Sequence, residues 1–242
     1  FHNVLCLSEA KGMDIIMKRI LCYGDSNTYG YNPYTQGRYS KSVRWPGVLA
    51  ELLGEEYEVI EEGLNNRTTA LEPEGEPWRS GMYYLEPCLR SHIPVDLFML
   101  MLGSNDMKTV FGQTAETIGA HVRQLIQKIK RISAEKNPAG RSCEILLICP
   151  IFVSEHIIGV DYADEFGGMA AVELSRQLPP VYEQIAREEG CIYLNGADCA
   201  EPSRADGLHL DEDGHRQMAE AVAEVIRHHE RKGKYQKNTK NI

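Results

Sequence analysis

The sequence predicts an α/β domain, a three-layer α/β/α sandwich with a mostly parallel five-stranded sheet between its helices. Two observations support this fold class. Apolar runs of strand length alternate along one contiguous chain with segments whose apolar residues repeat at helical spacing. In addition, the run within residues 95–106 is apolar almost throughout, which is typical of strands buried on both faces of a parallel sheet.

Five runs are predicted to be strands, and three of them stop at polar turns that contain glycine. The strands are residues 19–23, 57–60, 143–150 and 191–194, together with the run over residues 95–106, which ends in the turn at residues 103–106. The turns are residues 24–27, 63–69 and 103–106. Ligands bind at the carboxyl ends of parallel strands, so we expect the three turns to share one rim and to form the site there.

Helices are expected between the strands. Their predicted bounds are residues 44–54, 114–134, 170–189 and 212–232. Pro179 and Pro180 should interrupt or kink the third of these helices. Residues 71–94 contain four prolines and are expected to be mostly loop with one short helix, whereas residues 150–169 are expected to form one wall of a pocket.

Length and charge limit the organisation of the chain. The 242 residues fit a single domain over residues 17–231, and no linker rich in Pro, Gly or Ser divides it. Residues 1–16 are expected to be an N-terminal extension outside the core, and residues 232–242 a basic C-terminal tail. A net charge of −9 argues against nucleic acid as a partner. No apolar run approaches the roughly 20 residues that span a membrane.

The cysteines, the other histidines and several charged residues keep structural interpretations. Seven cysteines are present without a CxxC pair, and the histidines lack paired ligand spacing, so we expect neither a metal nor another cofactor. Asp25 is expected to bond the loop backbone, and Arg67 and Asp106 to brace the rim. The N-terminus lacks the basic and apolar regions of a secretory signal, so a reducing cytoplasm is the expected location.

Ser26 is the candidate nucleophile, because it directly follows the first strand at the predicted rim. Two other interpretations stay open at this point. A serine in a strand-to-helix turn commonly caps the helix, and Ser26 to Gly30 could instead cradle a phosphate, as in flavodoxin. Asp206 and His209 favour catalysis, because a histidine that accepts a serine proton needs a carboxylate partner, and their spacing within one loop can provide it.

With these residues in order, the sequence resembles the SGNH (GDSL-type) superfamily of serine hydrolases, which have a flavodoxin-like α/β/α fold. Four blocks carry the resemblance. They are Gly24-Asp25-Ser26, Gly63 to Thr69, Gly103 to Asp106, and Asp206 to His209. More narrowly, GDSNTYGY, RWPGVL, EEGLNNRTT and MLGSNDMK look like the bacterial arylesterase and acyltransferase branch, which acts on short acyl esters.

The resemblance implies a role for each of five residues. Ser26 would be the nucleophile, His209 the general base and then acid, and Asp206 its orienting partner. The oxyanion would be held by the backbone N–H groups of Ser26 and Asn66 and by the side-chain amide of Asn105. The superfamily usually has glycine where this chain has Asn66, and asparagine tolerates unusual backbone angles better than most residues.

These roles predict a metal-free serine esterase for small-molecule esters, which passes a short acyl group from Ser26 to water or to another alcohol. A deacetylase of O-acetylated carbohydrate is the alternative on the same fold, and a flavin- or phosphate-binding module is the alternative outside enzymes. Tyr29, Tyr31 and Trp45 are candidates to line the substrate pocket, with simple packing as their other interpretation. By resemblance we also expect a homo-oligomer.

Overall fold

The computed structural model describes residues 17–136 and 140–239, so the predicted extension over residues 1–16 lies outside the described residues. Its centre is a five-stranded sheet with the strand order β2-β1-β3-β4-β5, in which every neighbouring pair is parallel. The strands are β1 (Lys18–Gly24), β2 (Tyr57–Gly63), β3 (Leu97–Met101), β4 (Glu144–Cys149) and β5 (Ile192–Asn195). The predicted parallel sheet is confirmed, although β3 is shorter than the run over residues 95–106.

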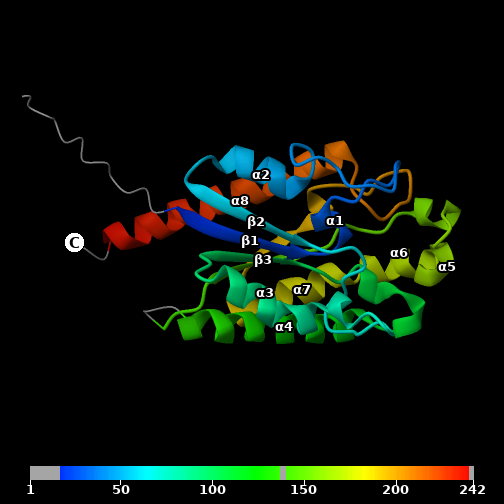
Figure 1. The fold of residues 1–242 in the computed structure, drawn as a ribbon, viewed down its shortest axis with the longest axis horizontal. Helices are drawn as coiled ribbons and strands as arrows, with labels where there is room; N and C mark the ends of the chain where they lie inside the picture. The colour runs from blue at the N-terminus through cyan, green and yellow to red at the C-terminus, as the bar shows by residue number, and fades with distance from the viewer. Residues whose placement is uncertain (1–16, 137–139, 240–242) are drawn as a thin grey trace, which may run out of the picture.

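Helices cover both faces of this sheet (Figure 1). One layer contains α2 (Trp45–Leu53) and α8 (Glu212–Thr239), and the other contains α3 (Gly81–His92), α4 (Ala115–Lys136) and α7 (Leu178–Glu189). Side chains alternate between the faces of a strand, so each strand feeds two cores. In β1, Cys22 packs in the core under α2 and α8, and Leu21 packs in the core of the opposite layer. The predicted α/β/α sandwich is therefore confirmed.

Residues 71–94 differ from the prediction, because they contain the twelve-residue helix α3 rather than mostly loop. Ser80 caps this helix, since its side chain accepts a hydrogen bond from the backbone N–H of Tyr83. Pro87 lies inside the helix and cannot donate to the carbonyl of Tyr83. Tyr83 is exposed, so water can take the place of that bond, while the inner face of α3 stays buried in the core.

Two helix boundaries in the C-terminal half can be compared with the prediction. The predicted interruption near Pro179 and Pro180 is confirmed, because α6 (Met169–Ser175) ends before them and α7 begins at Leu178. Both prolines stand in the first turn of α7, where a missing N–H costs no helical hydrogen bond. The backbone of α8 continues to Thr239, whereas the sequence predicted a tail from residue 232.

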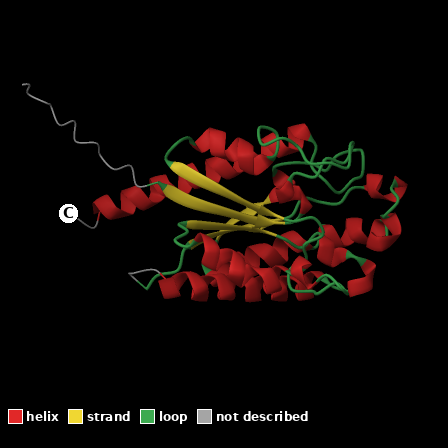
Figure 2. Ribbon diagram, viewed as in Figure 1, coloured by secondary structure: helices red, strands yellow, loops and turns green. Residues whose placement is uncertain are grey.

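The carboxyl ends of the strands all point to the end of the molecule where long loops gather (Figure 2). The short helices α1 (Ser26–Tyr29) and α5 (Ala163–Phe166) lie at the same end (Figure 1). The polar turns after β1, β2 and β3 therefore share one rim, as predicted. Among the helices in the described ranges, none combines the length and the apolar character that crossing a membrane requires.

Candidate active site

The turn after β1 presents Ser26 at the first position of α1. Asp25 precedes it and caps the helix by accepting the backbone N–H of Asn27 at 3.0 Å. The turn is tight, because a Cβ atom on Gly24 would lie 2.0 Å from the Thr28 hydroxyl and 2.9 Å from a β3 carbonyl. Glycine at position 24 thus allows α1 and the end of β3 to pack closely against the end of β1, where Ser26 follows at the rim.

Ser26, His209 and Asp206 form one hydrogen-bonded chain. The Nε2 atom of His209 lies 2.9 Å from the Oγ atom of Ser26. On the other side of the ring, Nδ1 lies 2.6 Å from Oδ2 of Asp206. All three residues are less than 9% exposed. The structure therefore brings together the three residues that the sequence selected from blocks at opposite ends of the chain.

Asp206 is held as a carboxylate by several donors. Its Oδ1 atom accepts the backbone N–H groups of Leu208 and His209 at 3.0 and 2.9 Å. Tyr162 donates its hydroxyl to Oδ2 at 2.8 Å. Burial opposes ionisation of Asp206, but the hydrogen bonds and positive charge from His209 outweigh it and leave the pKa of Asp206 below its usual value. An ionised Asp206 can therefore orient the imidazole and stabilise its charged form.

Asn27 connects the serine turn to the histidine loop. Its side-chain amide donates to the carbonyl of Leu208 at 3.2 Å, and its Oδ1 atom accepts the backbone N–H of Leu210 at 2.8 Å. The ring of Tyr31 packs against the ring of His209, with 4.5 Å between the centroids. These contacts fix the imidazole relative to Ser26.

Asn66 and Asn105 line the same pocket as Ser26. The amide of Asn105 donates to the carbonyl of Arg67 at 3.1 Å, which sets its orientation. Asn66 has a φ of 62°, in the left-handed region that glycine adopts freely. Lys108 reaches the Asn66 side chain, with Nζ 3.1 Å from Oδ1, and pairs with Glu165 at 2.9 Å. The loop after β2 is thus attached to the segments after β3 and β4.

Two of the residues predicted to brace the rim do so beneath the site. Arg67 is buried, donates to the carbonyl of Gly24 at 2.8 Å, and stacks on the ring of Tyr23 at 4.2 Å. Asp106 accepts the backbone N–H of Thr69 at 2.9 Å and also its hydroxyl. Burial raises the pKa of Asp106 to about 6, although its bonds with Thr69 work in the opposite direction. Burial also raises the pKa of Asp25.

A pocket of about 310 Å³ opens over Ser26. Its lining includes Ser26, His209, Tyr31, Asn65, Asn66, Asn105, Arg79, Lys108, Tyr162, Glu165, Phe166 and Leu208. A second hollow of about 340 Å³ adjoins it, sharing Asn66, Arg79, Asn105, Lys108 and Glu165, and continuing to Pro73, Val110 and Phe111. The wall predicted over residues 150–169 is present, because Tyr162, Glu165 and Phe166 all belong to it.

The three aromatic candidates for the pocket separate in the structure. Tyr31 lines the pocket, as predicted. Trp45 does not, because it begins α2, is fully buried, and packs in the core between that helix and the sheet. Tyr29 is not part of the lining either, and its ring lies 4.3 Å from the guanidinium of Arg38. Proximity to the nucleophile in sequence therefore did not place Tyr29 and Trp45 near it in space.

Sequence reasoning missed Lys108 and Arg79 and did not assign Tyr162 to Asp206. Tyr162 contacts a residue far away in sequence, and no local pattern marks that pairing. Lys108 lies two residues after the third block, at the end of the motif MLGSNDMK, and a positive charge beside a polar turn was the only available signal. Both residues belong to the pocket because the fold brings three loops to one rim.

Comparisons with known proteins match the chain over most of its length. The GDSL-like lipase/acylhydrolase family matches residues 22–217. The native M. smegmatis aryl esterase has a TM-score of 0.81 at 32% identity, over 87% of this chain and 98% of that chain. A carbohydrate acetylesterase family member from Sinorhizobium meliloti has a TM-score of 0.80 at 36% identity, over 87% and 98% of the two chains.

One curated relative is longer than this chain. An acetylxylan esterase from Xylanibacter ruminicola is 24% identical over 228 residues. The match covers 86% of this chain, but the chain spans only 43% of that protein's length.

Proposed function

The chain belongs to the GDSL-like lipase/acylhydrolase family and is an esterase, and from this we propose that it cleaves esters of short carboxylic acids through an acyl-Ser26 intermediate. The observation that carries the proposal is the hydrogen-bonded chain from Ser26 through His209 to Asp206, which opens on the pocket. Serine, imidazole and carboxylate in this order activate a serine hydroxyl as a nucleophile.

In the proposed reaction His209 moves one proton twice. Nε2 takes the hydroxyl proton while Oγ of Ser26 bonds to the ester carbonyl carbon, which gives a tetrahedral oxyanion. Nε2 then gives that proton to the alkoxide as the carbon–oxygen bond breaks, so the alcohol leaves and an acyl-serine remains. Water or a second alcohol then attacks the acyl carbon while Nε2 takes its proton, and Nε2 gives that proton to Oγ of Ser26 as the acyl–serine bond breaks. This frees the carboxylic acid or a new ester and restores the serine.

The oxyanion would be held by the backbone N–H groups of Ser26 and Asn66 and by the amide of Asn105. Support comes from their shared pocket and from the bond that orients Asn105 toward the loop of Arg67. Preorganised donors of this kind contribute about 3 to 4 kcal/mol each in the transition state. The left-handed backbone of Asn66 lets it stand where the superfamily usually has glycine.

One observation favours a small acyl group, and a second favours an acetylated sugar as a second candidate substrate. The pocket over Ser26 is about 310 Å³, and each buried methylene adds about 0.8 kcal/mol only until such a space is full. Arg79, Lys108 and Glu165 offer charged hydrogen-bonding groups in the adjoining hollow, as sugar hydroxyls require. Carbohydrate acetylesterases among the structural relatives support this alternative. Family membership removes the flavin- or phosphate-binding alternative.

Substitution of the proposed nucleophile and base tests the mechanism. Ser26→Ala and His209→Ala should each lower the turnover of p-nitrophenyl acetate by about a thousandfold or more, and the double variant should be little worse, because the residues act as a unit. Asn105→Ala should cost about a hundred- to a thousandfold. Ser42→Ala and His228→Ala, both exposed, serve as controls. If Ser26→Ala keeps a tenth of the activity, another nucleophile operates.

The acyl preference is tested with esters that share one leaving group. We expect kcat/KM to peak between acetyl and butyryl esters and to fall sharply by octanoyl, because longer chains overfill the pocket. Acetylated sugars measured beside these esters distinguish a general short-acyl esterase from a carbohydrate deacetylase. An optimum at eight or more carbons would contradict the short-acyl assignment.

The homo-oligomer remains a prediction from the resemblance. Val110, which lines the hollow beside the pocket, and Ile158 expose 81% and 56% of their surface, which is consistent with a partner covering them. Sedimentation velocity of the purified chain would measure the assembly directly, and a monomer at micromolar concentration would refute the expectation.

A further inference from the structure

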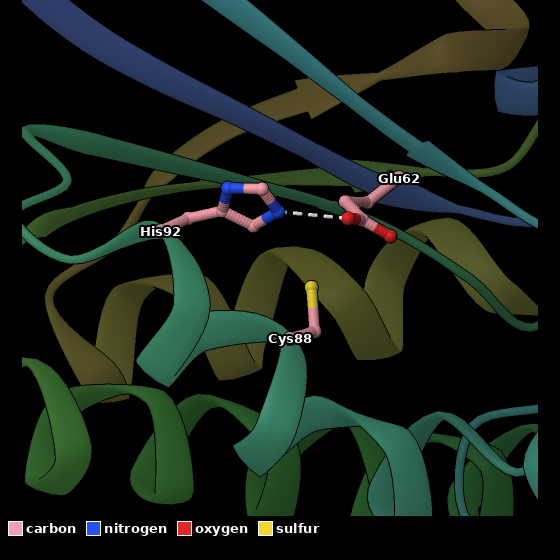
Figure 3. A group of neighbouring side chains, drawn as sticks. All are labelled: Glu62, Cys88 and His92. Atoms are coloured by element: carbon pink, nitrogen blue, oxygen red, sulfur yellow. Dashed lines mark hydrogen bonds and ion pairs between the residues drawn. The ribbon is translucent and has the colours of Figure 1, made fainter.

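We propose that Glu62, Cys88 and His92 form a binding site for a divalent cation of the zinc class. Their ligand atoms all lie within 4.8 Å of one another. Glu62 is the last residue but one of the edge strand β2, and the other two residues belong to α3. Figure 3 shows the imidazole and the carboxylate facing each other, with the sulfur of Cys88 pointing into the space beside them. The site is separate from the proposed catalytic residues.

The spacing of the ligands fits tetrahedral coordination. Cys88 and His92 are four residues apart on one helix, so their side chains share a face. Zinc bonds to nitrogen, oxygen and sulfur require about 3.3 to 3.6 Å between ligand atoms. His92 Nε2 and Glu62 Oε1 are 2.9 Å apart, so a cation needs only a small separation of the two side chains.

Burial and charge favour a soft or borderline cation over Mg²⁺ or Ca²⁺. Cys88 is only 2% exposed, whereas the side chains of His92 and Glu62 are 29% and 18% exposed, so an ion can enter from the solvent side. On binding, the thiol proton leaves to water, and the thiolate and the carboxylate neutralise the two positive charges of the ion. A set of sulfur, nitrogen and one oxygen is typical of zinc rather than of hard cations.

The positively charged Arg67 lies near the site but binds elsewhere. Arg67 uses its guanidinium for the backbone carbonyls of Gly24 and Glu62 and for the ring of Tyr23. The carboxylate of Glu62 has His92 as its ion-pair partner and also accepts hydrogen bonds from the Tyr84 hydroxyl and the Cys88 thiol. A bound cation would replace the hydrogen bond between His92 and Glu62, whose side chains already face each other.

The position of the site indicates a structural role. β2 and α3 are the two elements that flank residues 64–80, the loop that carries Asn66. A cation bound to Glu62 on one side and to Cys88 and His92 of α3 on the other would close the segment from β2 through this loop to the C-terminal part of α3. Joining loop ends removes conformational freedom from open states, so the ion would stabilise the loop without taking part in ester cleavage.

Cobalt provides a spectroscopic test. The full chain, freed of metal by a chelator and kept reduced by a phosphine, is titrated with Co²⁺. We expect one equivalent to produce thiolate-to-cobalt charge transfer and the visible bands of a tetrahedral ion. Cys88→Ser should abolish the charge transfer, and His92→Gln and Glu62→Gln should each weaken binding by about tenfold or more. No thiolate band, or one that survives Cys88→Ser, would overturn the proposal.

Matched controls and stability keep the test independent of folding defects and of the proposed esterase mechanism. His229→Gln removes a similar His–Glu pair, because His229 lies 2.8 Å from Glu144, and Cys199→Ser removes a partly buried thiol elsewhere. Both should bind Co²⁺ as the wild type does. Zn²⁺ should raise Tm equally in the wild type and in Ser26→Ala, and it should raise Tm of His92→Gln clearly less, because that variant binds more weakly. A Zn²⁺ shift in His92→Gln as large as in the wild type would refute the site, whatever the activity of Ser26→Ala.

Discussion

Asn66 shows how one residue can meet two demands. Its left-handed backbone suits glycine, yet its side chain accepts a hydrogen bond from Lys108, which glycine could not do. Left-handed backbone costs a typical residue about 1 to 2 kcal/mol, and asparagine tolerates it better than most. Lys108 also pairs with Glu165, so the lysine joins the loop after β2 to the wall of the pocket. We therefore regard Lys108 as a residue that positions Asn66.

A double-mutant cycle tests this relation. Lys108→Met should lower kcat for p-nitrophenyl acetate about three- to tenfold, because a hydrogen bond from a charged donor contributes roughly 1.5 to 3 kcal/mol at most when it is lost. Asn66→Gly keeps the backbone conformation but loses the same bond, so the double variant should be no worse than the poorer single variant. Lys130→Met, which disturbs a pair with Glu189 instead, is the control.

If the effects of Lys108→Met and Asn66→Gly multiply, the lysine acts on the substrate rather than through Asn66. A change confined to KM would lead to the same conclusion, because a positioning residue should act mainly on kcat.

At the residue scale, contiguous motifs determined what could be predicted. Ser26 and Asn105 each stand in a short block at a strand end, and Asp206 and His209 share one short block before α8. Such blocks are visible without a structure. The contact of Tyr162 with Asp206 joins two segments that no local pattern links. Glu62, Cys88 and His92 were not selected for the same reason, since only the packing of α3 beneath β2 brings them together.

At the scale of elements, composition misled the prediction where packing decides the structure. Four prolines in residues 71–94 indicated loop, and an internal proline can cost a helix about 3 kcal/mol. In α3 a cap at Ser80 and a buried apolar face oppose that cost. The prolines before α7 were interpreted correctly, because a proline in a first turn removes no hydrogen bond.

The segment after β4 contacts the proposed catalytic residues through the hydroxyl of Tyr162. Tyr162 holds Oδ2 of Asp206, the same oxygen that faces His209. We expect Tyr162→Phe to lower kcat about three- to tenfold, because Asp206 loses one fixed donor and becomes less well oriented. Tyr193→Phe removes a comparable hydroxyl bond, to the carbonyl of Pro179, and should leave kcat unchanged. Steady-state kinetics with p-nitrophenyl acetate compare the two variants, and equal activities would exclude the proposed role of Tyr162.

At the scale of the whole molecule, buried carboxyl groups make stability depend on pH. Asp106 follows β3 and bonds Thr69 in the loop after β2, so unfolding must expose it. Its pKa is about 6 in the folded chain against an ordinary 3.8. Between these values the folded chain keeps a proton that the unfolded chain has released. The free energy of unfolding should therefore fall as pH rises from about 4 to 6, by at most about 3 kcal/mol from this residue.

Urea unfolding at a series of pH values measures this slope. Asp106→Asn should flatten the fall between about pH 4 and 6, because the side-chain oxygen can still accept from Thr69 but no longer titrates. Asp213→Asn on the exposed start of α8 serves as the control. Asp206 does not interfere, since its lowered pKa places its own effect at more acidic pH, where stability is lost as pH falls. An unchanged slope in Asp106→Asn would refute the assignment.

The overall architecture was the most predictable level, because alternation of strands and helices leaves few arrangements for a parallel sheet. Loop contacts were the least predictable, because they depend on where those elements finally pack.

The two hydrogen bonds of Asn27 have a consequence for biosynthesis. They join the turn after the first strand to Leu208 and Leu210, which are 181 and 183 positions further along the chain. A ribosome delivers the histidine loop only after nearly all other elements have emerged, and contacts of such long sequence separation form slowly. No shorter nascent chain can hold the imidazole of His209 beside Ser26. The appearance of esterase turnover during translation or refolding would therefore time the closing of the fold, not its beginning.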